Sequence, residues 1–268
     1  MVPVLLAATT RIAAADEPHA LRHTGDWFLA GELGGSAAMM ALALAFHDPP
    51  ATCRWCQPND LDRSVRDALV VDPDYRRTAG AWSHVLSIGA AGALALSSAT
   101  VPAVTSGHGR YALQDSAIIL SAFSLTTAVG TVTKQAAGRR RPAFTMGEQH
   151  QTEFGDYPGQ QNLSFFSVDT AWAFSLGASA ATLAFLRGYR EAPYVVVAGA
   201  LIGIGTGLLR VASDVHWTTD VITGALVGTG IGVALPLALH RRETGSETGV
   251  AAQPLGAGTY GLALSGAF

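Results

Sequence analysis

Two short segments of the chain combine basic residues with a histidine and a carboxylate. The segment KQAAGRRRP begins at Lys134, the only lysine in the sequence, and contains three consecutive arginines. The segment RVASDVHWTTD contains Arg210, His216 and Asp220. Arginine and lysine side chains suit the oxygens of a phosphate group. Because His216 and Asp220 are one helical turn apart, the carboxylate can fix the imidazole tautomer and leave the other ring nitrogen free to attack.

A third segment, SFFSVDTAWAF, places a carboxylate at the start of an apolar run. After Asp169 the chain carries no Asp, Glu, Lys or Arg until Arg187. A side-chain oxygen of Ser167 or Asp169 can accept the free backbone N–H groups of a first helical turn, so a helix is predicted to begin here. The N-terminus of a helix also attracts anions, through its free N–H groups and the positive end of its dipole.

Each of these features has a simpler interpretation when it is taken alone. The run RRRP is more often a solvated basic patch or an anchor for lipid headgroups, and a lone His216 is more often structural. Asp220 alone predicts the N-cap of a helix, and Asp214 predicts a loop cap. The joint spacing favours chemistry over these separate interpretations. No function is predicted for five other histidines, which are His47, His84, His108, His150 and His240.

The composition indicates that long apolar helices position these residues. Hydrophobic residues make up 49% of the 268 residues and charged residues only 14%, whereas an average soluble domain is about 25% charged. Runs free of Asp, Glu, Lys and Arg reach the length of a bilayer span, although the same segments also fit buried helices of a soluble all-α protein. Their Gly, Ser and Thr content favours packed membrane helices. The runs cover residues 78–107, 116–133, 170–186, 192–209 and 221–240, and a shorter one extends from residue 33 to the charge at Asp48.

The predicted fold is therefore all-α, a six-helix membrane-associated bundle. If successive helices alternate in direction, the ends of the third and fifth helices and the starts of the fourth and sixth lie on one face. The polar and charged residues at those helix ends can then converge on a single oxyanion site. These residues are Lys134, Arg139, Arg140, Arg141, Ser167, Asp169, Arg210, His216 and Asp220.

The bundle is predicted to occupy residues 33–240, between an N-terminal segment (1–32) and a Gly- and Ala-rich C-terminal tail (241–268). The N-terminus resembles a degenerate signal sequence, because it is apolar but lacks a basic beginning and is interrupted by Arg11. A misplaced start codon would explain the same features. Cys53 and Cys56 are interpreted as a short-loop disulfide in preference to a redox motif or a zinc site. The net charge of −3 argues against nucleic acid as a partner.

The motifs resemble those of the type 2 phosphatidic acid phosphatase and vanadium-dependent haloperoxidase superfamily, over about residues 80–240. That superfamily has the motifs K-x6-R-P, P-S-G-H and S-R-x5-H-x3-D. The first motif is complete from Lys134 to Pro142, and the third has Leu209 where the family has serine. The second motif is degenerate, because FSVD stands at residues 166–169 in place of P-S-G-H.

The resemblance implies a role for each matching residue. His216 would be the nucleophile that forms a phosphohistidine, and Asp220 would orient it. Asp169 occupies the position of the histidine that protonates the leaving alcohol. The resemblance implies no metal site. It implies a cofactor only under the haloperoxidase alternative, in which His216 would hold vanadate. The residues implied to bind phosphate oxygens are Lys134, Arg141, Ser167 and Arg210.

Asp169 is a poor replacement for that histidine on ordinary pKa values. Asp169 must be protonated while His216 is neutral. The ordinary pKa values are about 3.9 for aspartate and about 6.5 for histidine, so both conditions hold in roughly 0.3% of molecules at best. Val168 also adds a Cβ where the family's glycine lets backbone approach the phosphate. The predicted site is therefore slow, retuned to acid pH, or limited to binding.

Three functions follow, in decreasing order of preference. The first is a phosphatase that hydrolyses a phosphate monoester or diphosphate, with a lipid or isoprenoid phosphate as substrate. The second is a catalytically impaired relative that binds anionic headgroups, and the third is a vanadate-dependent haloperoxidase. The predicted location is the cell membrane with the site on the outer face, because short loops on the opposite face are rich in arginine. Those arginines are Arg187, Arg190, Arg241 and Arg242. The sequence predicts neither the oligomeric state nor the identity of the lipid.

Overall fold

The computed structural model describes residues 17–45, 49–242, 249–256 and 259–265. Three subjects of the sequence analysis fall wholly or partly outside the described residues. They are the signal-like sequence at the N-terminus, His47, and the parts of the C-terminal tail between and after the described ranges.

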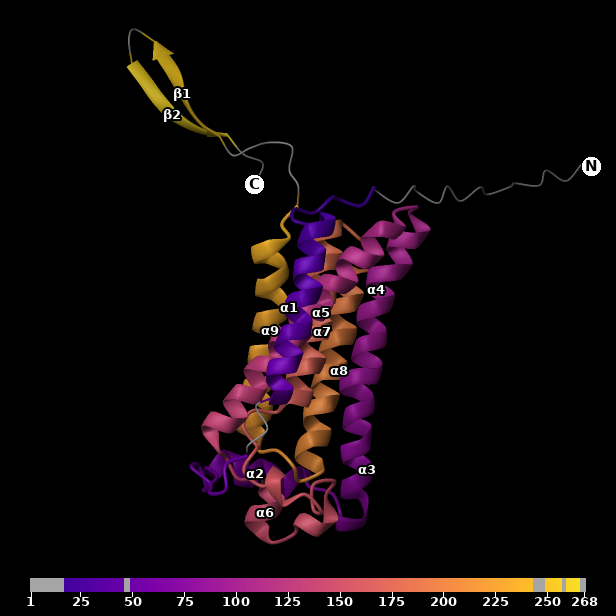
Figure 1. Cartoon of the computed structure of the whole chain (residues 1–268), viewed down its shortest axis with the longest axis vertical. Helices are drawn as coiled ribbons and strands as arrows, with labels where there is room; N and C mark the ends of the chain where they lie inside the picture. The colour runs from indigo at the N-terminus through magenta and orange to yellow at the C-terminus, as the bar shows by residue number, and fades with distance from the viewer. Residues whose placement is uncertain (1–16, 46–48, 243–248, 257–258, 266–268) are drawn as a thin grey trace, which may run out of the picture.

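Six long helices of the described chain run side by side and form a bundle (Figure 1). The all-α, six-helix prediction is confirmed, and the first helix begins earlier than its apolar run. The second helix is continuous and comprises α3 (Pro73–His84), the π-helical turn η1 (Val85–Ala90) and α4 (Ala91–Thr105). The others are α1 (Asp26–Ala45), α5 (Gly109–Ala137), α7 (Val168–Arg187), α8 (Ala192–Ala212) and α9 (Thr218–Leu239).

Short elements cover one end of the bundle, where α5 stops and α7 starts. This end, the cavity end, carries α2 (Asp60–Leu69) and α6 (Pro142–Met146) at the bottom of Figure 1. The loop between α6 and α7 also contains the 3-10 turns η2 (Gln149–Gln151) and η3 (Pro158–Gln160). The C-terminal tail, for which no strand was predicted, contains β1 (Gly249–Gly256) and β2 (Thr259–Ser265), which pair antiparallel with Gly249 opposite Ser265.

Local sequence explains several helix ends. Proline is tolerated in the first helical turn, where its missing N–H would have no partner, and Pro73 opens α3. Gly138 and Gly188 end α5 and α7 with φ values of 53° and 79°. Glycine adopts this left-handed conformation without a Cβ clash, so both helices stop there and turn toward the next element.

Small residues line the contacts between helices. The central helix α7 packs against α4, α5, α8 and α9, while α1 lies on α5. On α4 the buried positions recur every fourth residue, so alanine forms one face of that helix. Such faces let membrane helices approach closely. These α4 positions are Ala91, Ala95, Ala99 and Ala103.

The glycines of α9 bring it into backbone contact with α7. A Cβ on Gly224, Gly228 or Gly232 would lie closer than 3.0 Å to α7, against the carbonyl oxygens of Ser167, Ala171 and Ser175, respectively. This α7–α9 seam therefore leaves no room for a side chain at those three positions. It fixes the distance between the start of α7 and the start of α9.

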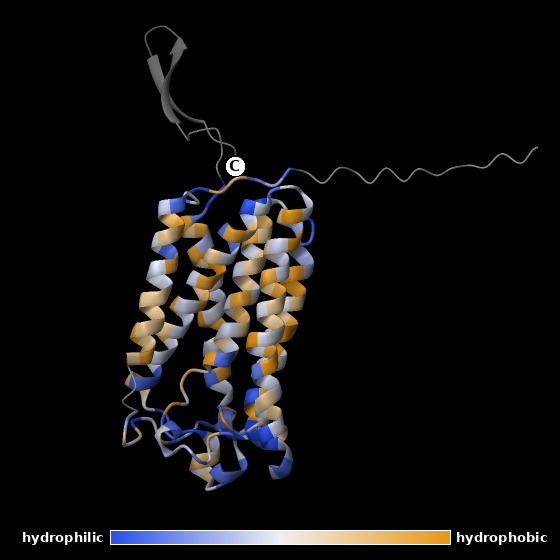
Figure 2. Cartoon of the chain, turned by 45° about the vertical axis from the view of Figure 1, so that its right-hand side comes forward, coloured by the Kyte–Doolittle hydropathy of each residue, from blue (hydrophilic) through white to orange (hydrophobic). Residues whose placement is uncertain are grey.

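The outer surface of the bundle is apolar along the helices and polar at both ends (Figure 2). Large apolar side chains point outward, and Leu113, Leu201 and Leu226 are 73%, 65% and 69% exposed. Water-soluble proteins bury such side chains, whereas a bilayer solvates them, so the membrane interpretation holds over the soluble one. Five helical segments of the described residues are long and apolar enough to cross a membrane: Asp26–Ala45, Pro73–Thr105, Gly109–Ala137, Ala192–Ala212 and Thr218–Leu239.

The opposite end of the bundle, the closed end, buries paired charges. Arg187 is fully buried, and its Nη2 and Nε donate to Asp115 Oδ1 at 2.6 and 3.0 Å. His240 Nε2 lies 2.7 Å from Glu32 Oε1. Arg187 is therefore an internal ion-pair residue, and its use as an exposed loop charge in the sequence analysis was wrong.

Candidate active site

A cavity of about 640 Å³ lies at the cavity end of the bundle. Its lining combines apolar residues of α1, α5 and α7 with a cluster of ionisable side chains. Two of the predicted site residues, Ser167 and Asp220, are not part of the lining. The predicted residues that do line it are Lys134, Arg141, Asp169, Arg210 and His216.

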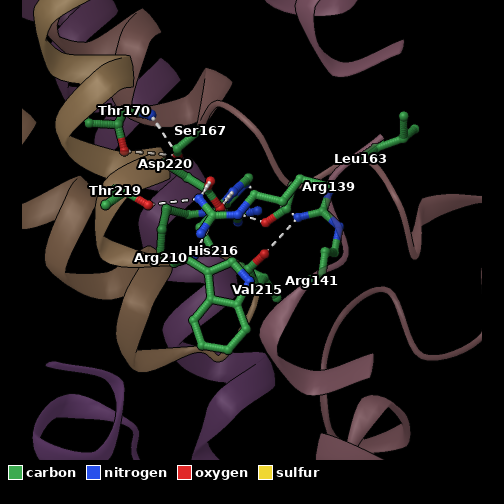
Figure 3. Close-up of polar contacts among 12 residues, drawn as sticks. Arg139, Arg141, Leu163, Ser167, Thr170, Arg210, Val215, His216, Thr219 and Asp220 are labelled. Carbon is green, nitrogen blue, oxygen red and sulfur yellow. Dashed lines mark hydrogen bonds and ion pairs between the residues drawn. The ribbon is translucent and has the colours of Figure 1, made fainter. Parts of the chain in front are cut away.

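His216 lines the cavity and lies between Arg141 and Asp220, both labelled in Figure 3. Arg141 Nη1 lies 3.3 Å from His216 Nε2. Because a guanidinium group can only donate, Nε2 accepts, and the proton of the neutral ring is on Nδ1. Nδ1 faces Asp220 Oδ2 at 3.4 Å. This is the tautomer that a nucleophilic Nε2 requires.

The surroundings of His216 keep its ring neutral. Burial lowers the pKa of His216 well below its ordinary value, and the charges of Lys134 and Arg141 lower it further. The Nε2 lone pair therefore remains available at neutral and mildly acidic pH.

Asp220 is fully buried and held on both of its oxygens. Oδ2 accepts from Ser164 Oγ at 2.5 Å and from the backbone N–H of Trp217 at 2.9 Å, so Asp220 also stabilises the first turn of α9. Arg139 donates to Oδ1 and pairs with Asp62 of α2 on its other side. Arg139 thus supports Asp220 from behind and does not line the cavity.

Lys134 and Arg141 are held by neutral carbonyl groups. Lys134 Nζ donates to Leu163 O at 2.7 Å. Arg141 donates from Nε to Gln160 O at 2.8 Å and from Nη1 to Val215 O at 2.9 Å. Burial, reinforced by the nearby charge of Arg210, lowers the pKa of Arg141 to about 9. These cations are positioned without being neutralised, which is the arrangement that attracts an anion.

Arg210 is fully buried and already has anionic partners. Its Nη1 donates to Glu153 Oε1 at 2.6 Å and to Ser83 Oγ at 3.0 Å, and its Nη2 lies 3.5 Å from Asp169 Oδ2. Although burial raises the pKa of Glu153, a hydrogen bond with His84 and the charge of Arg210 bring it to about 2. Glu153 is therefore ionised and lies where an oxygen of a bound phosphate would also meet Arg210.

Ser167 caps α7, and Asp169 does not. Ser167 Oγ accepts from the backbone N–H of Thr170 at 3.4 Å and lies 2.9 Å from Thr170 Oγ1, away from the cavity. Asp169 instead points into the cavity, where Ser87 Oγ donates to its Oδ1 at 3.4 Å. Of the two caps that the sequence allowed, Ser167 is the one that forms, and the Asp169 carboxylate is free for other contacts.

His84 belongs to this site, and the sequence analysis missed it. Its Nδ1 lies 2.7 Å from Asp169 Oδ1 and its Nε2 lies 3.1 Å from Glu153 Oε2. The ring lines the cavity, and both of its carboxylate partners also contact Arg210 of the third motif. One signal was available in the sequence: an ionisable residue inside a membrane-spanning run is costly, so it is a functional candidate by default.

Asp214 also has a larger role than the predicted loop cap. It is fully buried with a φ of 63°, and it accepts from Arg66 Nε at 2.6 Å and from Arg66 Nη2 at 2.8 Å. Arg76 of α3 donates to the same carboxylate at 3.1 Å. The loop that carries His216 is thereby fastened to α2 and α3.

Val168 lines the cavity at the position of the family's glycine. Gly130 of α5 makes room for its side chain, because a Cβ on Gly130 would meet Val168 Cγ2 at 2.5 Å.

Cys53 and Cys56 form the disulfide that the sequence analysis favoured. Arg54, one of the two residues between them, donates its backbone N–H to Gly138 O at 3.0 Å, which ties this loop to the end of α5.

Together the apolar bundle and its cation-lined cavity define a membrane protein with a candidate site for an anion. Residues 115–243, which contain all three motif positions, match the family model of the PAP2 superfamily. This match confirms, for residues 115–243, the resemblance that the motifs predicted.

A solved structure has the same fold. It is described as the first transmembrane PAP2 type phosphatidylglycerolphosphate phosphatase from Bacillus subtilis. The two chains share 17% sequence identity at a TM-score of 0.51, over 77% of this chain and 94% of that one. The similarity at this identity shows a common fold. No curated protein sequence matches the chain.

Proposed function

We propose that this protein is a membrane phosphatase that hydrolyses a phosphate monoester or diphosphate of a lipid through a phosphohistidine at His216. The observation that carries the proposal is the orientation of the imidazole. Its Nε2 accepts from Arg141 at 3.3 Å and faces the cavity, while Nδ1 faces Asp220. A neutral nucleophile surrounded by cations can attack a phosphorus atom whose oxygens those cations hold.

The proposed reaction proceeds in two displacements. Lys134, Arg141 and Arg210 bind the non-bridging oxygens of the phosphate. His216 Nε2 attacks phosphorus, the bond to the leaving oxygen breaks, and a phosphohistidine forms. Water then displaces phosphate from the histidine. No metal ion or cofactor takes part.

The shape of the cavity supports a lipid substrate. Beside the cations, the lining continues along α1 with Met40, Ala43 and Leu44 and includes Trp172 of α7. A phosphate headgroup at the cations would thus have an apolar wall for its chain. The similar Bacillus subtilis protein is described as acting on phosphatidylglycerolphosphate, a lipid phosphate.

Phosphate release from phosphatidate and from p-nitrophenyl phosphate tests the proposal. Purified wild-type protein is expected to release phosphate from both esters, and His216→Ala to be slower by about 10³-fold or more. The matched control is His150→Gln, which changes an exposed histidine at the same end. A base-stable, acid-labile phosphoenzyme should form in the wild type and not in His216→Ala. Equal rates in the wild type and His216→Ala would contradict the proposal.

One observation favours a second function, the binding of anionic headgroups without hydrolysis. Asp169 stands where the family's histidine would be, and Arg210 already contacts both Asp169 and Glu153. Binding of phosphatidate vesicles that depends on Arg141, with no release of phosphate, would support this alternative.

We also infer that the cavity end faces outward from the cell. Among the described residues the closed end carries five exposed arginines and the cavity end three (Arg54, Arg63 and Arg77), and arginine-rich short loops favour the cytoplasmic side. The disulfide of Cys53 and Cys56 at the cavity end fits an oxidising compartment. The exposed arginines of the closed end are Arg22, Arg110, Arg190, Arg241 and Arg242.

A further inference from the structure

Phosphate ester hydrolysis at this site needs a proton for the leaving oxygen. An alkoxide is a poor leaving group, and a positioned acid accelerates its departure by about 10²–10⁴-fold. Asp169 is badly suited to supply that proton, because its two oxygens already face His84, Ser87 and Arg210 as hydrogen-bond acceptors or ion-pair partners. The donor must then come from another group that lines the cavity.

Most of the other ionisable groups in the lining are committed or remote from the cations. Lys134 and the two arginines hold phosphate oxygens in the proposed function, and His216 is the nucleophile. Asp156 and Tyr157 lie on the open side, with 70% and 63% exposure, and Asp156 pairs with Arg77. The group that remains is His84.

The contacts of His84 require a proton on each ring nitrogen. Nδ1 lies 2.7 Å from Asp169 Oδ1, and Nε2 lies 3.1 Å from Glu153 Oε2. Ionised carboxylates only accept hydrogen bonds, so an imidazole between two of them must donate from both nitrogens and is an imidazolium. Arg210 contacts the other oxygen of each carboxylate, Glu153 Oε1 and Asp169 Oδ2, and thereby keeps both ionised.

We propose that His84 of α3 is the general acid of this phosphatase and that Asp169 is its positioning residue. The assignment rests on the proposed function of His216. In this proposal the protonating histidine lies on α3, whereas the family's motif places it at the start of α7. Asp169, at that α7 position, holds His84 by Nδ1. The chain therefore has a complete set of groups for hydrolysis despite its degenerate second motif.

The proton balance is as follows. His216 Nε2 bonds to phosphorus while the bond from phosphorus to the alcohol oxygen breaks, and that oxygen takes the Nε2 proton of His84. Neutral His84 then accepts a proton from water as the water oxygen bonds to phosphorus and the phosphorus–nitrogen bond to His216 breaks. The products are the alcohol and inorganic phosphate, and both histidines return to their starting states.

Nε2 is the nitrogen that can turn to the substrate. Its partner Glu153 lies on the loop between η2 and η3, and the same carboxylate occupies Arg210. A phosphate that binds Arg210 displaces Glu153 and so releases Nε2. Nδ1 keeps its shorter bond to Asp169, which is fixed in the first turn of α7.

The local backbone also directs this face of the second helix into the site. The helix changes to a π-helical turn immediately after His84, and such turns are frequent at functional sites. Ser83 accepts from Arg210 and Ser87 donates to Asp169, so the residues on both sides of His84 contact the same cluster. The partners of the His84 ring are thus contacted from its own helix as well.

Leaving-group dependence tests the proposal. A p-nitrophenolate leaves without a proton, whereas the alcohol of phosphatidate needs one. His84→Gln is therefore expected to lower kcat for phosphatidate about 10²–10⁴-fold and kcat for p-nitrophenyl phosphate less than about 10-fold. The retained aryl activity itself reports that the variant is folded. His150→Gln is the matched control and should change neither rate.

Two further variants separate a catalytic from a structural role. Asp169→Asn should also lose more activity on phosphatidate than on the aryl ester, and combining it with His84→Gln should cause little additional loss, because the two residues act as one unit. Added imidazole should restore part of the phosphatidate activity of His84→Ala. A merely structural histidine would show no such rescue.

The outcomes also distinguish the two proposals. Equal loss on both esters in His84→Gln, in an enzyme whose activity depends on His216, would overturn the role of His84 and leave the proposed function standing. A larger loss in Asp169→Asn than in His84→Gln would return the general-acid role to Asp169. If wild-type protein hydrolyses neither ester in a His216-dependent way, both proposals fall.

Discussion

Both ends of the bundle hold buried arginine–carboxylate pairs, but the cavity end also holds two cations, Lys134 and Arg141, whose main partners are carbonyl oxygens. At the closed end Arg187 meets Asp115 and His240 meets Glu32. At the cavity end Lys134 donates to a neutral backbone carbonyl, and Arg141 does the same. A cation with a buried carboxylate partner is already satisfied, whereas a cation held only by carbonyls still gains from an anion. The closed end is thus built for stability and the cavity end for binding.

The largest expected effect is on stability at the closed end. Asp115→Asn keeps the side-chain volume but leaves Arg187 buried without its counter-charge. The free energy of unfolding in mixed micelles should fall by about 3–5 kcal/mol. Replacing both partners, as Asp115→Leu with Arg187→Met, should restore most of it. The control is Asp26→Asn, which removes an exposed carboxylate near the same end that pairs with Arg110 and should cost less than about 1 kcal/mol.

The activity of Asp115→Asn is measured as well. Once folded, it should hydrolyse phosphatidate at the wild-type rate, because the closed end does not line the cavity. Loss of activity without loss of stability would show that the closed end is part of the catalytic machinery, and the contrast between the two ends would fail.

The next effect is on binding at the cavity end. Lys134→Met should weaken inhibition by inorganic phosphate roughly 10- to 150-fold, since a hydrogen bond from a charged group contributes about 1.5–3 kcal/mol. Stability should be unchanged or higher, because a buried ammonium near Arg141 and Arg210 is removed. The inhibition constant and the unfolding midpoint are measured together, with Arg63→Met of α2 as an exposed control. If Lys134→Met destabilises the protein as much as Asp115→Asn and leaves phosphate inhibition unchanged, the two ends do not differ in kind.

The smallest effect concerns which end faces outward. The disulfide closes a very short loop, so Cys53→Ser with Cys56→Ser should cost no more than about 2 kcal/mol and leave hydrolysis near the wild-type rate. In intact cells a membrane-impermeant maleimide should label the wild type only after an impermeant reductant is added. Full labelling of both cysteines without reductant would place the cavity end in a reducing compartment and reverse the proposed orientation.

The sequence predicted those features that depend on short-range spacing. The apolar runs marked the long helices, because charged side chains are excluded from membrane-spanning segments unless they are paired or functional. The K-x6-R-P and R-x5-H-x3-D spacings identified Lys134, Arg141, Arg210, His216 and Asp220, since each set lies around one helix end. These are properties of neighbouring residues and can be read without tertiary structure.

What could not be predicted depends on helices that meet only after folding. His84 lies far along the chain from Asp169, and nothing in the run AWSHVLS indicates which helix it will face. Arg187 was taken for a loop charge because its partner Asp115 is also distant in sequence. The choice of Ser167 over Asp169 as the cap was open, because both side chains can cap a helix and only the contacts of Asp169 decide between them.

The seam between α7 and α9 has a consequence for how this sequence can diverge from its relatives. Because backbone touches backbone there, the start of α9 and the histidine just before it keep their distance from α7 whatever side chains α7 carries. The second motif sits at the end of that rigid contact. Changes in these residues therefore need not displace His216, since Gly130 makes room for Val168 and Asp169 lies in the cavity wall. The glycines of α9 would thus hold the proposed nucleophile in place whichever residue supplies the proposed acid.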